Sequence, residues 1–464
     1  IKDQLADYFS EYALVKYRVF VEIQWLKFQL DHLHTETLDK VDPNKVDDIL
    51  AISKDFNFDS FKRIKEIESV TRHDVKAVEY FIDEKLKALG YEHLESYVHI
   101  GCTSEDINNT SYACMIKHGL KDVWLPAAKE FASMINKLAV DHKDDAMLAH
   151  THGQPATPTT IGKEFKVYAY RFFSSIENVE NIKIKAKFNG ATGNYSAILT
   201  AFPNEDWPTL NKEFVEDYLG LTFNPLTTQI ESHDYTCHIL DGIRHFNNVL
   251  ADLDVDMWLY ISMEYFKQIP VKGEVGSSTM PHKVNPIRFE NSEANIDLSN
   301  NLCVALSNKL PKSRMQRDLS DSSSQRNLGL CFGYSLQAIS ETTGGLAKCV
   351  VNKEKLAKDL NEKWGEGTVT LTISEQYRNM AEIISTCMHL IDNAKKACEN
   401  ADVTPLVLPI RGGTDGCQLS FKGLPCPNLG TGGHAYHGPY EHITVEGMDK
   451  SVDVVTELVK LYAM

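Results

Sequence analysis

The stretch ILDGIRHFNNVLADLDVDMWLY, residues 239–260, decides the fold class of this chain. Its apolar residues recur at steps of three and four, the spacing that places side chains on one face of a helix. They are Ile239, Ile243, Phe246, Leu250, Leu253, Met257 and Tyr260. No proline occurs between Pro225 and Pro270, so one uninterrupted helix about 45 Å long is possible.

Three other segments repeat this helical pattern. One apolar stripe comprises Phe165, Ala169, Phe172, Ile176 and Val179, and another runs from Met115 to Val140 with an expected break at Pro126. Residues 11–30 are apolar on most sides, which predicts a helix covered over most of its surface. Long helices with wide apolar faces predict an all-α bundle completed by other copies of the chain. A helical core confined to one chain is the alternative.

The sequence changes character near Trp364. The last 100 residues hold 11 of the 26 glycines, and TVTLTI (368–373) and LVLPI (406–410) have the pattern of short strands. A closing helix is predicted, with one apolar face made of Met448, Val452, Val455, Val459 and Tyr462. An α/β-like C-terminal segment is therefore expected after the helical body.

Composition excludes several classes of function. The formal net charge of −16 argues against a broad basic surface for nucleic acid. The ten cysteines show no CxxC spacing, which indicates reduced cytoplasmic thiols. No apolar run reaches 18 residues, so no membrane span is expected. No signal peptide is visible, although the chain begins at Ile1 and not at Met.

The loop GEVGSSTMPHKVNPIRFENSEAN, residues 273–295, carries the chemistry. Asn285 and Pro286 are typical of a helix N-cap and first position, so a helix should start at Ile287. A helix N-terminus beside Lys283 and Asn285 is suited to bind an anion. Nearby cations and amides can also stabilise a serine alkoxide, so a serine here can act as a base. The alternative is a capped turn with solvated hydroxyl groups.

GSSTMPHKVNP (276–286) resembles the signature loop of the fumarase/aspartase superfamily, GSSxMPxKxN. The histidine after Met280-Pro281 and the following FENSEAN resemble the adenylosuccinate lyase family most closely. Further blocks resemble that family in order over roughly residues 1–364. They are TRHDVKAVEY (71–80), GCTSEDINNTS (101–111), HTHGQPATPTT (150–160), TTQIESHDY (227–235) and RMQRDLSDSSSQRN (314–327).

The resemblance implies a role for each matched residue. Ser277 would be the catalytic base, with Ser278 as second choice, and His152 the general acid. The implied substrate-binding residues are Arg72, His73, Asp74, Thr103, Ser104, Gln229, Lys283, Asn285, Asn291, Arg317, Ser322 and Arg326. Among these, Thr103 and Ser104 would bind a carboxylate, and the last three would bind the phosphate. Without the resemblance, His73-Asp74 and Thr103 would be helix caps, His152 a structural turn residue, and residues 314–327 a solvated turn.

The resemblance also implies the reaction and the assembly. The family releases fumarate by β-elimination from adenylosuccinate, giving AMP, and from SAICAR, giving AICAR, without a metal or other cofactor. Its sites form in a homotetramer, where each takes segments from three subunits. Another superfamily C–N lyase, such as argininosuccinate lyase, and a non-catalytic scaffold are the alternatives; the expected phosphate block argues against the first.

The chain departs from the family at both ends. The family usually begins with a segment like SPxDGRY, which is absent here. From about Gly365 the sequence resembles the C-terminal end of tripeptidase T, an M20-type zinc peptidase; His437 would match a zinc ligand and Arg411 a substrate-side loop. No Glu-Glu pair occurs anywhere, and His142-Lys143-Asp144 is a chance HxD in the lyase-like body, so no working peptidase is expected. A natural fusion, a chimera and a sequence error all remain open explanations for the join.

Four domains are therefore expected. They are an N-terminal helical domain (1–92), a central long-helix bundle (93–345), the start of the lyase C-terminal domain (346–364) and a tripeptidase-T-like segment (365–464).

Overall fold

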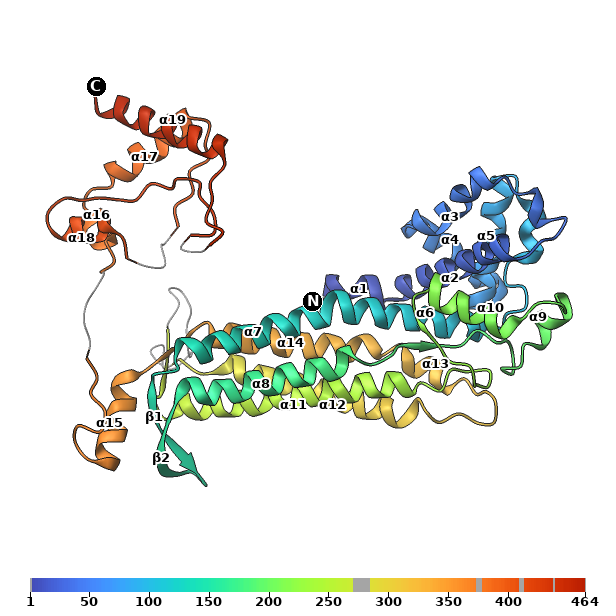
Figure 1. The fold of residues 1–464 in the computed structure, drawn as a ribbon, viewed down its shortest axis with the longest axis horizontal. Coiled ribbons are helices and arrows are strands. Elements are labelled where there is room, and N and C mark those ends of the chain that lie inside the picture. The colour runs from blue at the N-terminus through green and yellow to red at the C-terminus, as the bar shows by residue number, and fades with distance from the viewer. Residues whose placement is uncertain (1, 270–283, 373–377, 409–412, 437–438, 464) are drawn as a thin grey trace. The chain divides into compact units, whose positions relative to one another are not determined.

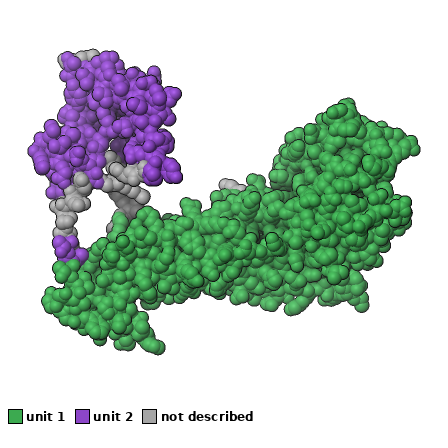
Figure 2. Space-filling model, viewed as in Figure 1, with its two compact units in different colours: residues 1–370 green, residues 371–464 purple. Residues whose placement is uncertain are grey.

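The chain forms two compact units, residues 1–370 and 371–464 (Figure 2). The computed structural model describes residues 2–269, 284–372, 378–408, 413–436 and 439–463. Helices dominate both units, and no helix among the described residues is long and apolar enough to cross a membrane. The finer division of the first unit at residues 92, 345 and 364 stays a prediction.

Five long helices lie side by side in the first unit (Figure 1). They are α7 (Leu125–Asp141), α8 (Ile161–Glu180), α11 (Asp234–Ser262), α12 (Ile287–Lys309) and α14 (Leu328–Leu346). The stripe that begins at Ile239 is buried as far as Met257, and the five apolar residues of α8 from Phe165 to Val179 are buried too. The predicted helical bundle is confirmed.

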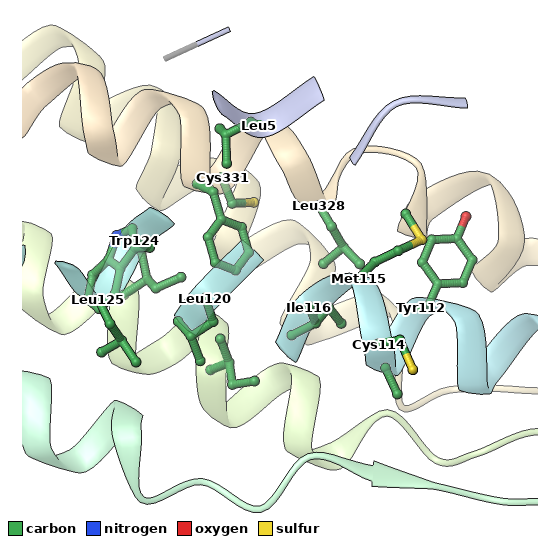
Figure 3. Close-up of a cluster of buried hydrophobic side chains, with 14 of the residues drawn as sticks. Leu5, Tyr112, Cys114, Met115, Ile116, Leu120, Trp124, Leu125, Leu328 and Cys331 are labelled. Carbon is green, nitrogen blue, oxygen red and sulfur yellow. The ribbon is translucent and has the colours of Figure 1, made fainter. Parts of the chain in front are cut away.

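The predicted break of the helix at Pro126 is wrong, because the helix continues through this position. Helix α6 (Ser104–Gly119) passes through one π-helical turn, η4 (Leu120–Trp124), directly into α7. The Leu125 N–H bonds to the Leu120 carbonyl, and Pro126 lies in the first turn of α7, where a missing N–H is tolerated. Leu120, Trp124 and Leu125 still pack into the core beside α14 (Figure 3). The helix therefore accommodates Pro126 without a break, with one wider π-helical turn, η4, directly before it.

Helices before α6 form the N-terminal part of the unit. They are α1 (Lys2–Phe9), α2 (Glu11–His32), α3 (Val46–Lys54), α4 (Phe58–Thr71) and α5 (Asp74–Ala88), with short 3-10 turns at Leu38–Lys40, Pro43–Lys45 and Glu92–Tyr97. Helix α2 buries residues on most of its surface, as predicted, and three of them are polar: Arg18, Glu22 and Gln29.

Short strands and helices connect the long helices. The strands pair as an antiparallel hairpin of β1 (Ala146–Thr151) and β2 (Gln154–Thr160), a parallel pair of β3 (Lys185–Ala186) and β4 (Thr222–Phe223), and an antiparallel pair of β5 (Phe266–Gln268) and β6 (Cys349–Val351). The remaining elements are α9 (Ser196–Ala201), α10 (Trp207–Glu213), the π-helical η5 (Phe214–Tyr218), α13 (Ser320–Gln325) and α15 (Lys353–Trp364).

The second unit contains α16 (Ala381–Ile384), α17 (His389–Asn400), α18 (Asp415–Phe421) and α19 (Val445–Tyr462). The two predicted strands are wrong in their described parts, because residues 368–372 and 406–408 are irregular. A strand needs a partner to accept its ladder of hydrogen bonds, and the described residues of this unit offer only an isolated bridge between His434 and His442.

The closing helix is confirmed, but the face it buries is not the predicted one. Val454, Leu458 and Leu461 pack with Ala397 and Ala401 in a small core between α17 and α19. The predicted face is exposed, from 51% at Val455 to 65% at Val452. The apolar stripe from Met448 to Tyr462 therefore predicts the helix correctly. In the described part of the unit, no other element covers that stripe.

Candidate active site

The signature loop lies mostly outside the described residues, which include neither Ser277, Ser278 nor Lys283. Beyond the loop, α12 begins at Ile287 as predicted. Pro286 holds the cap position and no side chain caps the helix, so the expected capping role of Asn285 is wrong. The Gln268 amide on β5 donates to the Val284 carbonyl at 2.9 Å and ties the end of the loop to the bundle.

His152 lies at the tip of the β1–β2 hairpin. His152 and Gly153 connect the strands, and both have a positive φ, 56° and 72°, the pattern of a type I′ turn. Histidine, like asparagine and aspartate, adopts this left-handed conformation more often than most other non-glycine residues do. Its side chain is exposed, so the hairpin presents the imidazole outward from its own chain.

Thr103 and Ser104 lie at the N-terminus of α6. The Thr103 N–H donates to the Asp106 carboxylate at 2.8 Å, so Thr103 is the N-cap that the alternative interpretation expected. Behind it, the Lys187 ammonium lies 2.8 Å from Asp106, with both side chains almost fully buried. The remaining N–H groups of the first turn and the Ser104 hydroxyl suit a carboxylate ligand.

Arg317 joins this N-terminus from a distant part of the sequence. Its Nη2 lies 3.3 Å from the Glu105 carboxylate, and its Nη1 lies 3.0 Å from Asp321 on α13. Arg326 ends α13, is exposed and lines a cavity of about 250 Å³ together with Tyr112. Two predicted blocks, residues 101–111 and 314–327, therefore meet in one chain.

The two carboxyl groups that contact Arg317 have pKa values shifted in opposite directions. Burial raises the pKa of Glu105 to about 7, although the Arg317 charge opposes the shift. Burial also disfavours the Asp321 carboxylate, but a hydrogen bond from His233 and the Arg317 charge together hold its pKa below the usual value. Asp321 is therefore the firmer anionic partner of the arginine.

The remaining predicted positions in this part of the unit are Ser322 and Gln229. The Ser322 N–H donates to the Asp321 carboxylate at 2.7 Å, within α13. The Gln229 amide donates to the Ala191 carbonyl at 2.9 Å, so it links two loops of its own chain.

The block around Arg72 is organised by an arginine that the sequence analysis missed. Arg18, buried in α2, donates to Asp74 at 2.7 Å and to Asn108 on α6 at 2.9 Å. His73 caps α5, where its Nδ1 accepts the Lys76 N–H at 3.1 Å, and Arg72 ends α4 with a φ of 56°. A charged residue inside the apolar segment 11–30 was the available signal, because a buried charge needs a partner.

Glu22 and His99 form a second buried pair that the sequence analysis missed. The Glu22 carboxylate lies 2.6 Å from His99 Nδ1. Burial opposes the protonated ring, but Glu22 and Glu79 prevail and raise the pKa of His99 to about 8. His99 also has a φ of 62°, another left-handed residue close to the α6 N-terminus.

Within one chain, the predicted site residues of the bundle form two clusters that lie at its opposite ends (Figure 1). Thr103, Ser104 and Arg317 lie where α6 and α11 begin, whereas His152 and Asn285 lie where α8 and α12 begin. Asn291 is exposed one turn into α12. Helix α11 alone has 29 residues, a length of about 43 Å, so the clusters cannot act on one small molecule within one chain.

No metal centre is apparent in the part of the chain that the structure describes, since it holds no group of three His, Cys, Asp or Glu side chains arranged around a common point. All ten cysteines are free thiols.

Solved structures and family models both match this chain. The structures include the 3-carboxy-cis,cis-muconate lactonizing enzyme from Pseudomonas putida, with a TM-score of 0.63, 16% identity, and coverage of 99% of this chain and 97% of that one. A fumarate lyase from Mesorhizobium sp. BNC1 has a TM-score of 0.62 and 15% identity, over 87% and 88% of the two chains. These likenesses show the fold. The model of the lyase family matches residues 1–296, and that of the adenylosuccinate lyase C-terminal region matches residues 313–371.

Curated relatives match over more than three quarters of the chain. The adenylosuccinate lyase of Vibrio cholerae is 46% identical over 361 residues, which is 78% of this chain and 79% of that protein. The adenylosuccinate lyase of Escherichia coli K12 is 46% identical over 357 residues, 77% and 78% of the two chains. That of Legionella pneumophila strain Philadelphia 1 is 47% identical over 364 residues, 78% and 79%. With this identity over more than three quarters of its length, the chain belongs to the adenylosuccinate lyase family.

Proposed function

We propose that this protein is a C–N lyase that releases fumarate from adenylosuccinate, giving AMP, and from SAICAR, giving AICAR. The observation that carries the proposal is the 46% identity to adenylosuccinate lyases over 78% of the chain. The meeting of the α6 N-terminus with Arg317 supports it, because the substrates carry two carboxylates and a phosphate.

In the proposed mechanism, Ser277 takes a proton from the succinyl Cβ, and Ser278 is the second choice for this base. Negative charge then spreads into the adjacent carboxylate as an aci-carboxylate. Lys283, Asn285 and the N-terminus of α12 stabilise this charge. His152 protonates the departing nitrogen, a role suited to imidazole because it exchanges protons near neutral pH.

Substrate binding is assigned to the other predicted residues. Thr103 and Ser104 bind a carboxylate at the α6 N-terminus, while Arg317, Ser322 and Arg326 bind the phosphate. Arginine suits this task because its planar fork matches phosphate oxygens. The remaining substrate contacts are assigned to Arg72, His73, Asp74, Gln229 and Asn291. No metal or organic cofactor takes part in these steps.

A homotetramer completes the proposed site. The clusters at the two ends of the bundle come from different copies in this proposal, because they lie at opposite ends of helices as long as α11, whose 29 residues span about 43 Å. Exposed apolar side chains along the bundle supply surfaces for association, among them Tyr170 on α8, Trp258 on α11 and Leu298 on α12. We place three subunits at each site and the protein in the cytoplasm, a reducing compartment that suits its ten free thiols.

The segment 365–464 is proposed to derive from a tripeptidase-T-like protein and to lack peptidase activity. The exposed apolar face of α19 supports this origin, because a fragment of a larger domain loses the layer that covered such a face. Amino-acid release from a tripeptide by the zinc-supplied protein would contradict the proposal.

The test of the lyase function is fumarate release from adenylosuccinate by the full chain beside Ser277→Ala. We expect release by the parent and a loss of at least about 100-fold in the variant, since a positioned base contributes that much. Argininosuccinate is assayed separately, as the substrate of the alternative function. A soluble parent tetramer that releases no fumarate would reject the proposal and favour an inactive chimera.

A further inference from the structure

Arg317 is held between two buried carboxylates that come from different elements. Its Nη2 lies 3.3 Å from Glu105 on α6, and its Nη1 lies 3.0 Å from Asp321 on α13. Both carboxylate side chains are 5% exposed, whereas the Arg317 side chain is 17% exposed. The guanidinium is therefore fixed from the protein side and retains an accessible edge.

Asp321 is itself held by a third element. His233 Nε2 lies 3.2 Å from the same Asp321 oxygen that faces Arg317. His233 precedes α11 and has a φ of 62°, a conformation that costs a non-glycine residue energy. The Glu231 carboxylate accepts its N–H at 2.7 Å and the Asn224 amide at 2.8 Å. The loop that carries Gln229 is thus tied to Arg317 through His233 and Asp321.

This arrangement suits an arginine that must meet an anion in one orientation. A guanidinium has five N–H donors; Arg317 donates one hydrogen bond to Asp321 and pairs with the Glu105 charge, so donors are left for a ligand. The carboxylates also remove side-chain freedom before any ligand binds, which lowers the entropic cost of binding. Burying one arginine with two carboxylates costs solvation energy that their attraction does not always offset. The cluster is therefore weak evidence for a role in stability alone.

We propose that Glu105, Asp321 and His233 are positioning residues that orient the Arg317 guanidinium toward the phosphate of the substrate. The inference rests on the proposed function, because that function supplies the phosphate. Asp321 holds one arm of the fork and Glu105 the other, while His233 fixes Asp321. Each acts through Arg317 and touches no reacting atom.

The test compares adenylosuccinate with its nucleoside form, which lacks the 5′-phosphate, in the full-length Asp321→Asn variant. We expect kcat/KM for the nucleotide to fall about 10-fold, mainly through KM, because the lost interaction is a charge-assisted hydrogen bond. For the nucleoside, kcat/KM should stay within about twofold of the parent. Equal losses for both substrates would show general damage to the fold and would overturn the proposal, as would no loss for either.

Two further variants make the comparison specific. Glu105→Gln keeps the size of the side chain and should give a selective loss in the same direction but smaller, because burial raises the pKa of Glu105 to about 7 and Asp321 is the firmer anionic partner. It replaces Asp321→Asn if that protein does not fold. Arg314→Gln removes a neighbouring arginine whose side chain is 85% exposed, and it should leave the nucleotide-to-nucleoside ratio unchanged. A changed ratio in this control would show that any nearby charge matters and would also overturn the proposal.

Failure of the proposed function gives a different result. In that case the parent releases no fumarate from either substrate. The arrangement of Glu105, Asp321 and His233 around Arg317, called the clamp from here on, is then tested by calorimetry with AMP and adenosine. A preference for AMP that Asp321→Asn lowers about 10-fold supports the clamp even then. No preference for AMP in the parent rejects it.

Discussion

Lys187 is a fully buried charged residue of the first unit, and its environment gives a direct test at the scale of one residue. Its ammonium lies 2.8 Å from Asp106 and 2.8 Å from the Gly190 carbonyl, with no exposed side-chain surface. Lys187→Met should lower the free energy of unfolding by about 3 to 5 kcal/mol, because it leaves the buried Asp106 carboxylate without its cation. Urea denaturation of the full chain measures the change.

Lys137→Met is the matched control. Lys137 forms a salt bridge with Asp141 one turn away, but its side chain is 74% exposed. Such pairs contribute little, so the control should lose less than about 0.5 kcal/mol. Similar losses of unfolding free energy in the two variants would show that the buried pair of Lys187 and Asp106 stabilises the fold no more than an exposed pair does.

The β1–β2 hairpin offers a test at the scale of one element. Asparagine is favoured in type I′ turns, so His152→Asn should keep the hairpin and the unfolding midpoint. Fumarate release should fall by about 100- to 10,000-fold, since the variant lacks a proton donor for the leaving nitrogen. His152→Val is the contrast: a β-branched residue resists the φ of 56°, so stability should fall together with activity. Unchanged activity in His152→Asn would exclude this histidine as the acid.

Helices and sites differed in how far the sequence could predict them. Helices α8 and α11 follow from spacing alone, because a helix satisfies its backbone hydrogen bonds locally and its apolar stripe shows which side is buried. The strands expected at residues 368–373 and 406–410 are absent in their described parts, 368–372 and 406–408, because a strand depends on a distant partner. Arg18 and Glu105 were missed for a related reason: their partners are far away in sequence, and only the packed bundle brings them together. The same holds for the contact of Asp321 with His233, although its partner Arg317 is only four residues away.

At the scale of the whole molecule, the separation of the two clusters predicts complementation between inactive variants. Arg317→Gln and His152→Asn should each lose most of the activity, but a mixed tetramer can form sites in which an intact arginine and an intact histidine come from different copies. Unfolding and refolding the two variants together should therefore restore part of the fumarate release. A mixed tetramer without activity would mean that both residues of a site come from one chain.

Stability should decrease as pH rises through neutrality. Burial raises the pKa of Asp254 to about 8, and the pKa values of His99 and Glu105 are raised to about 8 and about 7. Each group binds its proton more tightly in the folded state, so its contribution is complete below its unfolded pKa and is lost as pH rises through its folded pKa. Each contributes a slope of about 1.4 kcal/mol per pH unit between those values. Urea denaturation at pH 6.5 and 8 should show the fall.

Asp254→Asn separates this effect from the rest of the titration. The carboxyl group accepts a hydrogen bond from Thr342 at 2.7 Å in the core between α11 and α14. The amide cannot ionise, so the variant should show a flatter dependence on pH over this range. An unchanged slope would exclude Asp254 as a contributor.

The position of His152 and Arg317 at opposite ends of one bundle also sets the kinetic order of the enzyme in its own concentration. In the proposed tetramer each site takes residues from different copies, so a lone subunit would hold two incomplete half-sites and the rate per chain would depend on how often chains meet. On dilution below the dissociation constant of the assembly, the specific activity should decline toward zero. A cell that doubles a scarce supply of this protein would then gain more than twice the flux.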